Sequence, residues 1–479
     1  MRRLLVIGLD SVPPEFVFDR YRDVMPNLKR ILSQSAYGTL KTTDPPITIP
    51  AWTVMFSGVD PGTLGLYGFR HRRLGSYQDT YTPTSKMVTY PCLWDLLSRG
   101  GRRVAVIGMP PGYPPPTVNG VYVSDLLTPD GAADFVSPGA LVPEVRAAAG
   151  GDYRFDVTFR AEDRDRVERE IFEMTRRRFA VARHLWGKER WDLFAVHEIG
   201  PDRIHHAFWK YFDHAHPKHV PGSPFDSIAD RYYALLDSEI GRLLESVPED
   251  VLLWVVSDHG SKAMDGCFCI NEWLIRAGYL VLKGSRPPPG TALETVDVDW
   301  SRTRVWGAGG YYARLFFNLR GREREGIVDP DDLPALTRAI EAGLAAMVRP
   351  DGEKMGVELL EPRKIYHEVR GDPPDLMAYF GNLSWRSAGT VGHDSLYLSE
   401  NDTGPDDSVH SMDGFFILHD PVDPRGTGRL PDQSILDVAP TLLKRLGMPV
   451  PPHMQGRPIP ELLSKRVERA RNDAPKKKG

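Results

Sequence analysis

Two short apolar runs that each end in a carboxylate dominate the hydrophobic pattern of this sequence. Residues 251–256 read Val-Leu-Leu-Trp-Val-Val and lead into Asp258 and His259, while residues 4–9 read Leu-Leu-Val-Ile-Gly-Leu and lead into Asp10. Apolar runs this short predict strands of a parallel sheet that is buried on both faces. If both strands lie in one sheet, their polar ends share the carboxyl edge, where open α/β sheets bind ligands.

The rest of the chain alternates between strand and helix patterns. A short apolar helix is expected to begin near Pro50, which suits a first helical position, and to end at Gly58. This βαβ rhythm predicts an α/β fold in which helices sandwich a large, mostly parallel sheet. Further strands are expected at 38–42, 103–108, 191–197, 375–380 and 415–418, and further helices at 25–32, 93–97, 228–244, 271–278 and 434–447.

Proline clusters at 110–116 and 287–289 interrupt this rhythm and predict two insertions. The first, residues 117–184, is expected to be a loop followed by a charged helix over 164–183 with a solvated face. The second, residues 298–372, is expected to be a small α+β cap with a strand at 311–318 and a helix at 333–347. The predicted catalytic core then comprises 1–116, 185–285 and 373–466, and residues 467–479 are expected to form a disordered basic tail.

Composition narrows the classes of partner. The 60 Lys and Arg residues nearly balance the 64 Asp and Glu residues, so the net charge of -4 predicts neither a nucleic acid polymer nor a membrane surface as partner. Three cysteines cannot form a disulfide framework, which favours a reducing compartment. The apolar start is too short for a secretory signal, and no run approaches the roughly 20 apolar residues of a membrane span. We therefore expect a cytoplasmic protein.

Several acids and histidines at predicted strand ends are candidate metal ligands. Asp202 and His206 lie four residues apart after the 191–197 strand, so on a helix they share one face. Carboxylate oxygens and imidazole nitrogens suit a divalent cation. Each residue also has an ordinary alternative, because an aspartate can cap a helix and a histidine can lie at the surface. Four further histidines lack such an acid partner, and most of them are expected at the surface: His205, His214, His216 and His219.

Thr48 is the candidate nucleophile. It lies at or beside the predicted start of the short apolar helix, where free N–H groups and the helix dipole favour an anion such as a phosphate or an alkoxide. The alternative is an ordinary N-cap threonine. Two cations about 4 Å apart stabilise in-line displacement at phosphorus and lower the pKa of a hydroxyl between them. One ion would take Asp10, Asp258 and His259, and the other Asp202, His206 and His410.

These motifs resemble the alkaline phosphatase superfamily in its type I phosphodiesterase/nucleotide pyrophosphatase branch, and in particular a group of predicted phosphohydrolases or phosphomutases. Thr48-Ile-Pro-Ala51 stands in the place of the Thr-Phe-Pro-Asn nucleophile motif. The similarity extends over nearly the whole chain. Its other pieces are Ile7-Gly-Leu-Asp10, Met25-Pro-Asn-Leu28, Tyr113-Pro-Pro115 with Asn119-Gly120, Asp202-x-x-x-His206, Ser257-Asp-His-Gly260, Asn318-Leu-Arg-Gly-Arg322 and Asp437-Val-Ala-Pro-Thr-Leu-Leu443.

The resemblance implies an alkaline-phosphatase-like fold and a metal-dependent phosphohydrolase, specifically a phosphodiesterase that acts on a small-molecule phosphate ester. It implies two divalent ions, zinc or alternatively manganese, and a phospho-threonine intermediate on Thr48. The Asp10, Asp258 and His259 ion would lie beside Thr48, and the other ion would activate water. His393, in Val-Gly-His-Asp394, is the rival of His410 as the last ligand.

The sequence departs from the family pattern in ways that bear on the reaction. Ala51 replaces the asparagine that follows the motif proline, and no cysteine lies in a sulfatase motif. Threonine in place of the serine of cofactor-independent phosphoglycerate mutases favours hydrolysis over mutase chemistry. The alternatives are a phosphomutase and a catalytically silent binding protein on the same fold. Candidates for binding the leaving group are Arg203, Trp306, Tyr311 and Tyr312.

Overall fold

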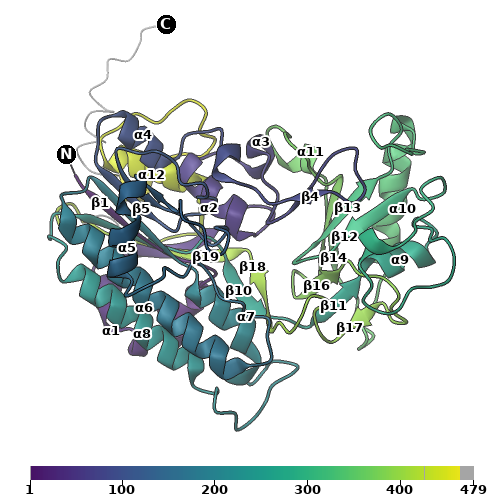
Figure 1. Cartoon of the computed structure of the whole chain (residues 1–479), viewed down its shortest axis with the longest axis horizontal. Coiled ribbons are helices and arrows are strands. Elements are labelled where there is room, and N and C mark those ends of the chain that lie inside the picture. Colours follow the sequence, from purple (N-terminus) through teal and green to yellow (C-terminus); the bar gives the residue numbers. More distant parts are fainter. Residues whose placement is uncertain (1, 425–426, 464–479) are drawn as a thin grey trace, which may run out of the picture.

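The computed structural model describes residues 2–424 and 427–463 and contains two α/β units that lie side by side (Figure 1). The larger unit is built on a ten-stranded sheet in which β21 (Gln433–Ser434) pairs with β2. The other strands, in spatial order, are β20 (Gly428–Arg429), β2 (Ala36–Lys41), β19 (Asp413–His419), β9 (Leu252–Val256), β1 (Leu4–Leu9), β8 (Leu193–Glu198), β5 (Val104–Ile107), β6 (Gly120–Val123) and β7 (Val136–Ser137).

The centre of this sheet is parallel, as the apolar runs predict. β1 lies between β8 and β9 and runs parallel to both. β5 continues the parallel arrangement beside β8, whereas β19 is antiparallel to β9. Asp10 and Asp258 therefore follow neighbouring strands at the same edge of the sheet. The predicted fold class, an α/β protein with a large and mostly parallel sheet, is confirmed.

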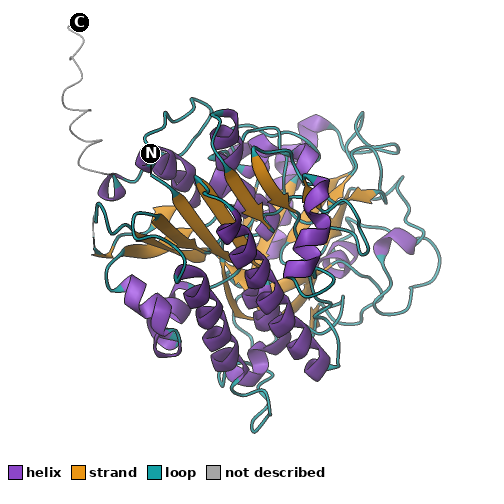
Figure 2. Ribbon diagram, turned by 60° about the vertical axis from the view of Figure 1, so that its left-hand side comes forward, coloured by secondary structure: helices purple, strands orange, loops and turns teal. Residues whose placement is uncertain are grey.

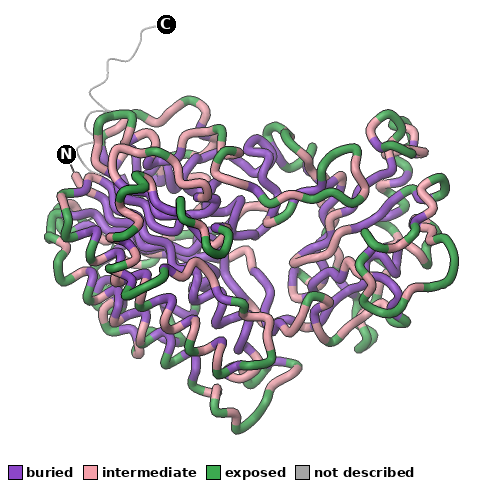
Figure 3. Tube along the Cα trace, in the orientation of Figure 1, coloured by how far each residue is buried: buried purple, intermediate pink, exposed green. Residues whose placement is uncertain are grey.

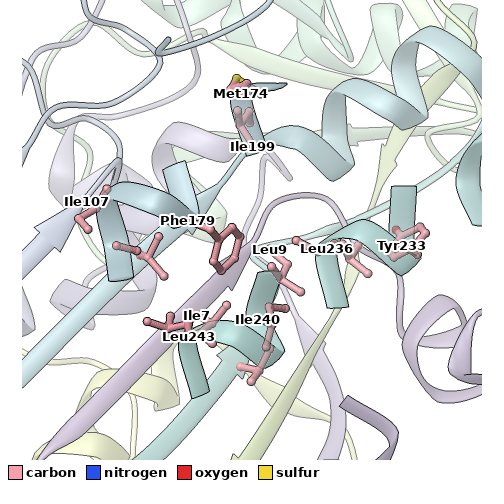
Figure 4. Close-up of a cluster of buried hydrophobic side chains, with 14 of the residues drawn as sticks. Ile7, Leu9, Ile107, Met174, Phe179, Ile199, Tyr233, Leu236, Ile240 and Leu243 are labelled. Carbon is pink, nitrogen blue, oxygen red and sulfur yellow. The ribbon is translucent and has the colours of Figure 1, made fainter. Parts of the chain in front are cut away.

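Helices cover both faces of the large sheet (Figure 2). Leu5, Ile7 and Leu9 of β1 pack against helices on one face, whereas Leu4 and Val6 pack against helices on the other. Figure 4 shows the first of these clusters, and Figure 3 shows that the central strands are buried while the outer loops are exposed. The helices of the first face are α1 (Pro26–Leu32), α5 (Val142–Ala148), α6 (Arg164–Lys188), α7 (Gly200–Phe212) and α8 (Ile228–Leu244), and those of the second are α2 (Thr48–Ser57), α4 (Leu93–Arg99) and α12 (Val438–Arg445).

The smaller unit contains a seven-stranded sheet with its own apolar core. The helices α9 (Ile270–Arg276) and α10 (Leu333–Ala345) contribute apolar side chains to that core. The strands, in spatial order, are β12 (Val305–Ala308), β13 (Ala313–Phe317), β15 (Leu376–Phe380), β16 (Trp385–Ala388), β11 (Gly266–Cys269) and β17 (Tyr397–Leu398), with β14 (Val357–Leu360) beside β15.

Short elements link the two units. The two-stranded ribbon of β10 (Gly260–Ala263) and β18 (Ser408–Ser411) lies between them in Figure 1. In the second two-stranded sheet, β3 (His71–Arg72) pairs with β4 (Thr80–Tyr81), and Arg72 forms a buried bidentate ion pair with Glu323 at 3.0 Å. The remaining α-helices of the described chain are α3 (Pro61–Leu64) and α11 (Pro362–Ile365).

The predicted elements form with ends displaced by a few residues, but two of the predicted groupings are wrong. The strand at 375–380 belongs to the smaller sheet as β15, because it pairs with β13 and β14 rather than with the parallel strands. The smaller sheet therefore draws on residues from 266 to 398, beyond the expected 298–372. Within 117–184, β6 and β7 extend the large sheet, and α6 buries an apolar face against it.

Two further predictions concern the ends of helix α2 and the C-terminal tail. Helix α2 begins at Thr48, two residues before Pro50, and Gly58 ends it in the left-handed conformation with φ 66°. The predicted tail at 467–479 lies outside the described residues. Among the helices that the structure describes, none is both long enough and apolar enough to cross a bilayer.

Packing of β9 predicts a measurable stability difference between two matched substitutions. Val255→Ala removes two methyl groups from a fully buried site and should cost about 2 kcal/mol, because both transfer and cavity terms are lost. Val422→Ala removes the same atoms from a side chain that is 63% exposed and should cost less than about 0.5 kcal/mol. Chemical denaturation followed by tryptophan fluorescence measures both. Equal losses would contradict the placement of β9 in the core.

Candidate metal centre and active site

The first cluster of candidate ligands lies at the carboxyl edge of the large sheet. Asp10 follows β1, and Asp258 and His259 follow β9, so the parallel pairing of these strands brings the three side chains together. Their ligand atoms all lie within 4.8 Å of one another. His259 Nε2 is 3.2 Å from Asp258 Oδ2 and 3.8 Å from Asp10 Oδ1. All three residues are fully buried.

The second cluster comprises Asp202, His206 and His410, whose ligand atoms also lie within 4.8 Å of one another. Asp202 and His206 lie one turn apart on α7, and Asp202 Oδ1 is 3.2 Å from His206 Nε2 and 3.5 Å from His410 Nε2. The β10 and β18 ribbon, which pairs Ser261 with His410, brings His410 to this site. The rings of His410 and His259 stack with centroids 3.9 Å apart, so the two clusters adjoin.

Thr48 lies beside the first cluster. It is the first residue of α2, and its Oγ1 is 3.4 Å from Asp10 Oδ1 and 3.3 Å from His259 Nε2. The side chain is almost fully buried. An anion held at the start of α2 would therefore face both the hydroxyl and the helix dipole.

The three histidines of the two clusters are oriented as metal ligands are. His259 Nδ1 donates to the Gly260 carbonyl at 3.1 Å, and His410 Nδ1 donates to the Pro46 carbonyl at 2.7 Å. His206 Nδ1 lies 2.7 Å from Asp406 Oδ1. A neutral imidazole that donates from Nδ1 keeps a lone pair on Nε2, and such outer contacts fix the rings of metal-binding histidines.

One oxygen on each of two cluster carboxylates has no hydrogen-bond partner. Within the described part of the chain, these buried atoms are Asp258 Oδ2 and Asp202 Oδ1, although Arg203 binds the other oxygen of Asp202. Each lies 3.2 Å from a histidine Nε2, and a cation between a carboxylate oxygen and a neutral imidazole nitrogen would bind both. Burial and the nearby Asp10 raise the pKa of Asp258, and burial and the nearby His410 lower the pKa of His259 to about 3. Both clusters therefore fit a divalent cation.

Comparison with known proteins identifies the family. The family model for type I phosphodiesterase / nucleotide pyrophosphatase matches residues 4–406. The chain belongs to this family. It is therefore a phosphoric ester hydrolase, of the phosphodiesterase and nucleotide pyrophosphatase type. No curated protein matches the chain.

Two solved structures share the fold of this phosphodiesterase. Murine ectonucleotide pyrophosphatase/phosphodiesterase 5, an inactive variant in complex with AMP, superposes with a TM-score of 0.54 at 14% identity, covering 95% of this chain and 97% of that chain. Human ectonucleotide pyrophosphatase/phosphodiesterase 5 gives 0.54 at 13% identity with the same coverage. These similarities support the alkaline-phosphatase-like fold.

Three contacts of the phosphodiesterase site were not predicted from the sequence. Trp52 Nε1 donates to Asp10 Oδ2 at 2.8 Å, and His197 Nε2 lies 2.8 Å from the same oxygen. A side chain on Gly8 would lie 2.6 Å from the Trp52 ring, so the glycine lets Trp52 lie over β1 and reach Asp10. Asp406 contacts His206 from the second cluster's outer side.

Two of these contacts had a signal in the sequence. Trp52 lies four residues after Thr48 and thus one helical turn away, and His197 lies near the end of β8 beside β1. Asp406 lies in a loop before β18, and its position depends on the folding of both units. Loop carboxylates of this kind have no periodic pattern that would predict their contacts.

The structure brings all seven predicted site residues together, and their role as ligands or nucleophile stays a proposal. His393 lies apart from them, with its Nε2 2.8 Å from Thr390 Oγ1. His205 is buried rather than at the surface, between Ser261 and Tyr233, because it faces the sheet from α7. His216 is also buried, whereas His214 is exposed and His219 partly so.

Of the four candidates for binding the leaving group, Trp306 lies away from the two clusters. Trp306 belongs to the core of the smaller unit, where its ring packs edge-to-face against Trp300. Arg203, Tyr311 and Tyr312 all line a cavity beside the clusters. Tyr311 stacks on His410 with ring centroids 3.8 Å apart, and its hydroxyl lies 3.2 Å from His206 Nε2.

Asp406 contacts two arginines and one histidine, so removal of its negative charge should destabilise the folded protein. It binds Arg386 and Arg160 at 2.8 Å, in addition to His206. Asp406→Asn should lower the free energy of unfolding by about 3 kcal/mol, because it leaves the buried Arg386 and the partly buried Arg160 without their carboxylate partner. The exposed pair of Arg349 and Asp351 offers the control, since Asp351→Asn should cost less than about 1 kcal/mol. Similar costs for both would show that Asp406 is not the anchor described.

Proposed function

We propose that this phosphodiesterase cleaves a P–O bond of a small-molecule phosphodiester by double displacement through Thr48 at a two-metal site. The observation that carries the proposal is the position of Thr48 Oγ1, at 3.3–3.4 Å from ligand atoms of one cluster, at the start of α2. In the first step Oγ1 bonds to phosphorus, one ester P–O bond breaks, and the leaving alcohol takes up the proton that the Thr48 hydroxyl loses. In the second step water attacks phosphorus, the bond to Oγ1 breaks, the phosphomonoester is released, and Oγ1 regains a proton from the water.

The residues that would hold the ions are Asp10, Asp258 and His259 for one and Asp202, His206 and His410 for the other. Such ions neutralise charge on the phosphoryl oxygens and lower the pKa of a nearby hydroxyl or water. Mixed carboxylate and imidazole ligands favour zinc and are compatible with manganese.

The protein's own groups prepare the nucleophile. Asp10 Oδ1 accepts the hydrogen bond of the Thr48 hydroxyl, which holds Oγ1 at the cluster. Trp52 and His197 engage the other Asp10 oxygen, so the carboxylate cannot rotate away. Because these groups are all buried, bulk water is kept from the nucleophile until substrate enters.

A nucleotide-sized substrate is the class that we favour. The murine relative of similar fold was solved in complex with AMP. A cavity of about 440 Å³ beside the clusters, lined by Tyr311 and Tyr312, is large enough for such a ligand.

The acceptor of the phosphoryl group distinguishes hydrolysis from phosphomutase chemistry. A hydrolase transfers the phosphoryl group to water, whereas a phosphomutase returns it to the organic product.

The nucleophile is tested by substitution at Thr48. Thr48→Ala should abolish turnover of bis(4-nitrophenyl) phosphate while both ions stay bound, because it removes the hydroxyl that donates to Asp10 and lies beside His259. Thr53→Ala is the matched control, since Thr53 is also buried in α2 and only hydrogen-bonds the Ile49 carbonyl. It should retain activity within a few-fold. Wild-type rates in Thr48→Ala would exclude the threonine mechanism.

The two-ion arrangement is tested by counting metal. The wild-type protein, purified and equilibrated with zinc, should hold two ions per chain by inductively coupled plasma mass spectrometry. Asp258→Asn and Asp202→Asn should each reduce this number by one, because each removes a carboxylate ligand from a different cluster. Asp125→Asn replaces a buried aspartate that accepts only backbone N–H groups and should leave the content unchanged. One ion or fewer in the wild-type protein would contradict the proposal.

A further inference from the structure

The cavity beside the metal clusters is unusual in its charge. Five arginines line it, whereas Asp156 is its one acidic lining residue. The cavity adjoins the two ligand clusters, because Ile47, which precedes Thr48, and Tyr311, which stacks on His410, both form part of its wall. The arginines are Arg70, Arg160, Arg203, Arg314 and Arg386.

Three of these arginines are neutralised by carboxylates. Arg203 binds both oxygens of Asp156 at 2.6 and 2.7 Å and also reaches Asp202 at 2.5 Å. Arg160 and Arg386 share Asp406 at 2.8 Å each. These three arginines lie on the outer side of the second cluster, and each already forms an ion pair with a carboxylate of the protein.

Arg314 and Arg70 differ from the other three. Arg314 of β13 donates to the backbone carbonyls of Arg70, at 2.5 Å, and of Gly309, at 3.3 Å. Among the residues that the structure describes, none places a carboxylate within ion-pair distance of either guanidinium. Both arginines therefore line the cavity without a carboxylate ion-pair partner, and Glu294 acts on Arg314 only from beyond ion-pair distance.

The surroundings of Arg314 favour a bound anion. Arg70 is exposed, but Arg314 is only partly exposed, and the aromatic side chains of Phe69 and Tyr312 lie in the same wall. Burial, with a smaller contribution from the Arg70 charge, lowers the pKa of Arg314, while Glu294 acts in the opposite direction. The hydroxyl of Tyr312 is engaged by the Tyr67 carbonyl at 2.6 Å, so it offers the arginines no negative partner. A bound oxyanion would relieve both the desolvation and the repulsion.

We propose that Arg314 and Arg70 bind a second anionic group of the substrate, a phosphate or a carboxylate that is distinct from the phosphoryl group attacked by Thr48. This inference rests on the proposed function and narrows its substrate class to phosphodiesters or pyrophosphates that carry a further oxyanion. The other three arginines already pair with carboxylates of the protein, so their charge is less available to a substrate anion. Arg314 and Arg70 are thus specificity-determining residues, while chemistry stays at the metal clusters.

Three matched esters test the proposal with the zinc-loaded protein. They are ethyl 4-nitrophenyl phosphate and two analogues in which the ethyl group ends in a carboxylate or in a phosphonate. The reacting phosphorus and the leaving group are the same in all three, so differences in kcat/KM report the added anion. We expect the wild-type protein to favour at least one anionic ester by about tenfold or more. The favoured ester tells a carboxylate from a phosphate subsite.

Arginine variants locate the preference. Arg314→Gln should reduce the preference to less than about twofold, and Arg70→Gln should reduce it in part. The readout is the ratio of kcat/KM between the anionic and the ethyl ester within each variant, so that a general change in activity cancels. Arg320→Gln is the control, because Arg320 lies in the smaller unit with an exposed ion pair to Asp329. It should keep the full preference. Equal kcat/KM for all three esters in the wild-type protein, or a preference that survives in both Arg314→Gln and Arg70→Gln, would overturn the proposal.

Binding measurements separate this inference from the proposed reaction. Isothermal titration of Thr48→Ala protein with all three esters reports affinity without turnover. The anion subsite is supported if an anionic ester binds more tightly than the ethyl ester and if adding Arg314→Gln removes this difference. This outcome stands even if the wild-type protein hydrolyses none of the esters and the proposed reaction fails. Equal binding of all three esters contradicts the subsite, whatever the activity.

Discussion

The structure depends on a cluster of carboxylates that the fold buries away from water. Asp10, Asp258 and Asp202 are buried at one edge of a parallel sheet, and two of their oxygens lack a hydrogen-bond partner in the described chain. Burying carboxylates without partners is costly, so an arrangement of this kind persists when a cation completes it. The histidines, which present Nε2 to the same points, complete the ligand set.

Much of the surrounding architecture can be understood as support for that edge. Parallel pairing of β1 with β9 fixes the first cluster, and the β10 and β18 ribbon carries His410 across to the second. Gly8 leaves room for Trp52, which locks Asp10, and Asp406 ties the smaller unit's Arg386 to His206. The smaller unit thereby contributes to the wall of the cavity beside the clusters, while the large sheet holds the side chains of the clusters in place.

Strand-end carboxylates and one-turn spacing made the core of the site predictable from sequence. A run of apolar residues before Asp10 or Asp258 indicates a buried parallel strand, and such strands deliver their ends to a common edge. The same reasoning could not assign the strand at 375–380 to a sheet, because an apolar run shows burial but not its partner. Nor could it find Asp406 or the unpaired state of Arg314, since both depend on contacts between segments far apart in the chain.

Anomalous X-ray diffraction at the zinc edge, from crystals of the zinc-loaded protein, tests the central claim most directly. The account predicts two strong peaks, one bounded by Asp10, Asp258 and His259 and the other by Asp202, His206 and His410, with Thr48 Oγ1 beside the first. Peaks at other places in the protein, or no peak at either cluster in protein that hydrolyses phosphodiesters, would contradict it.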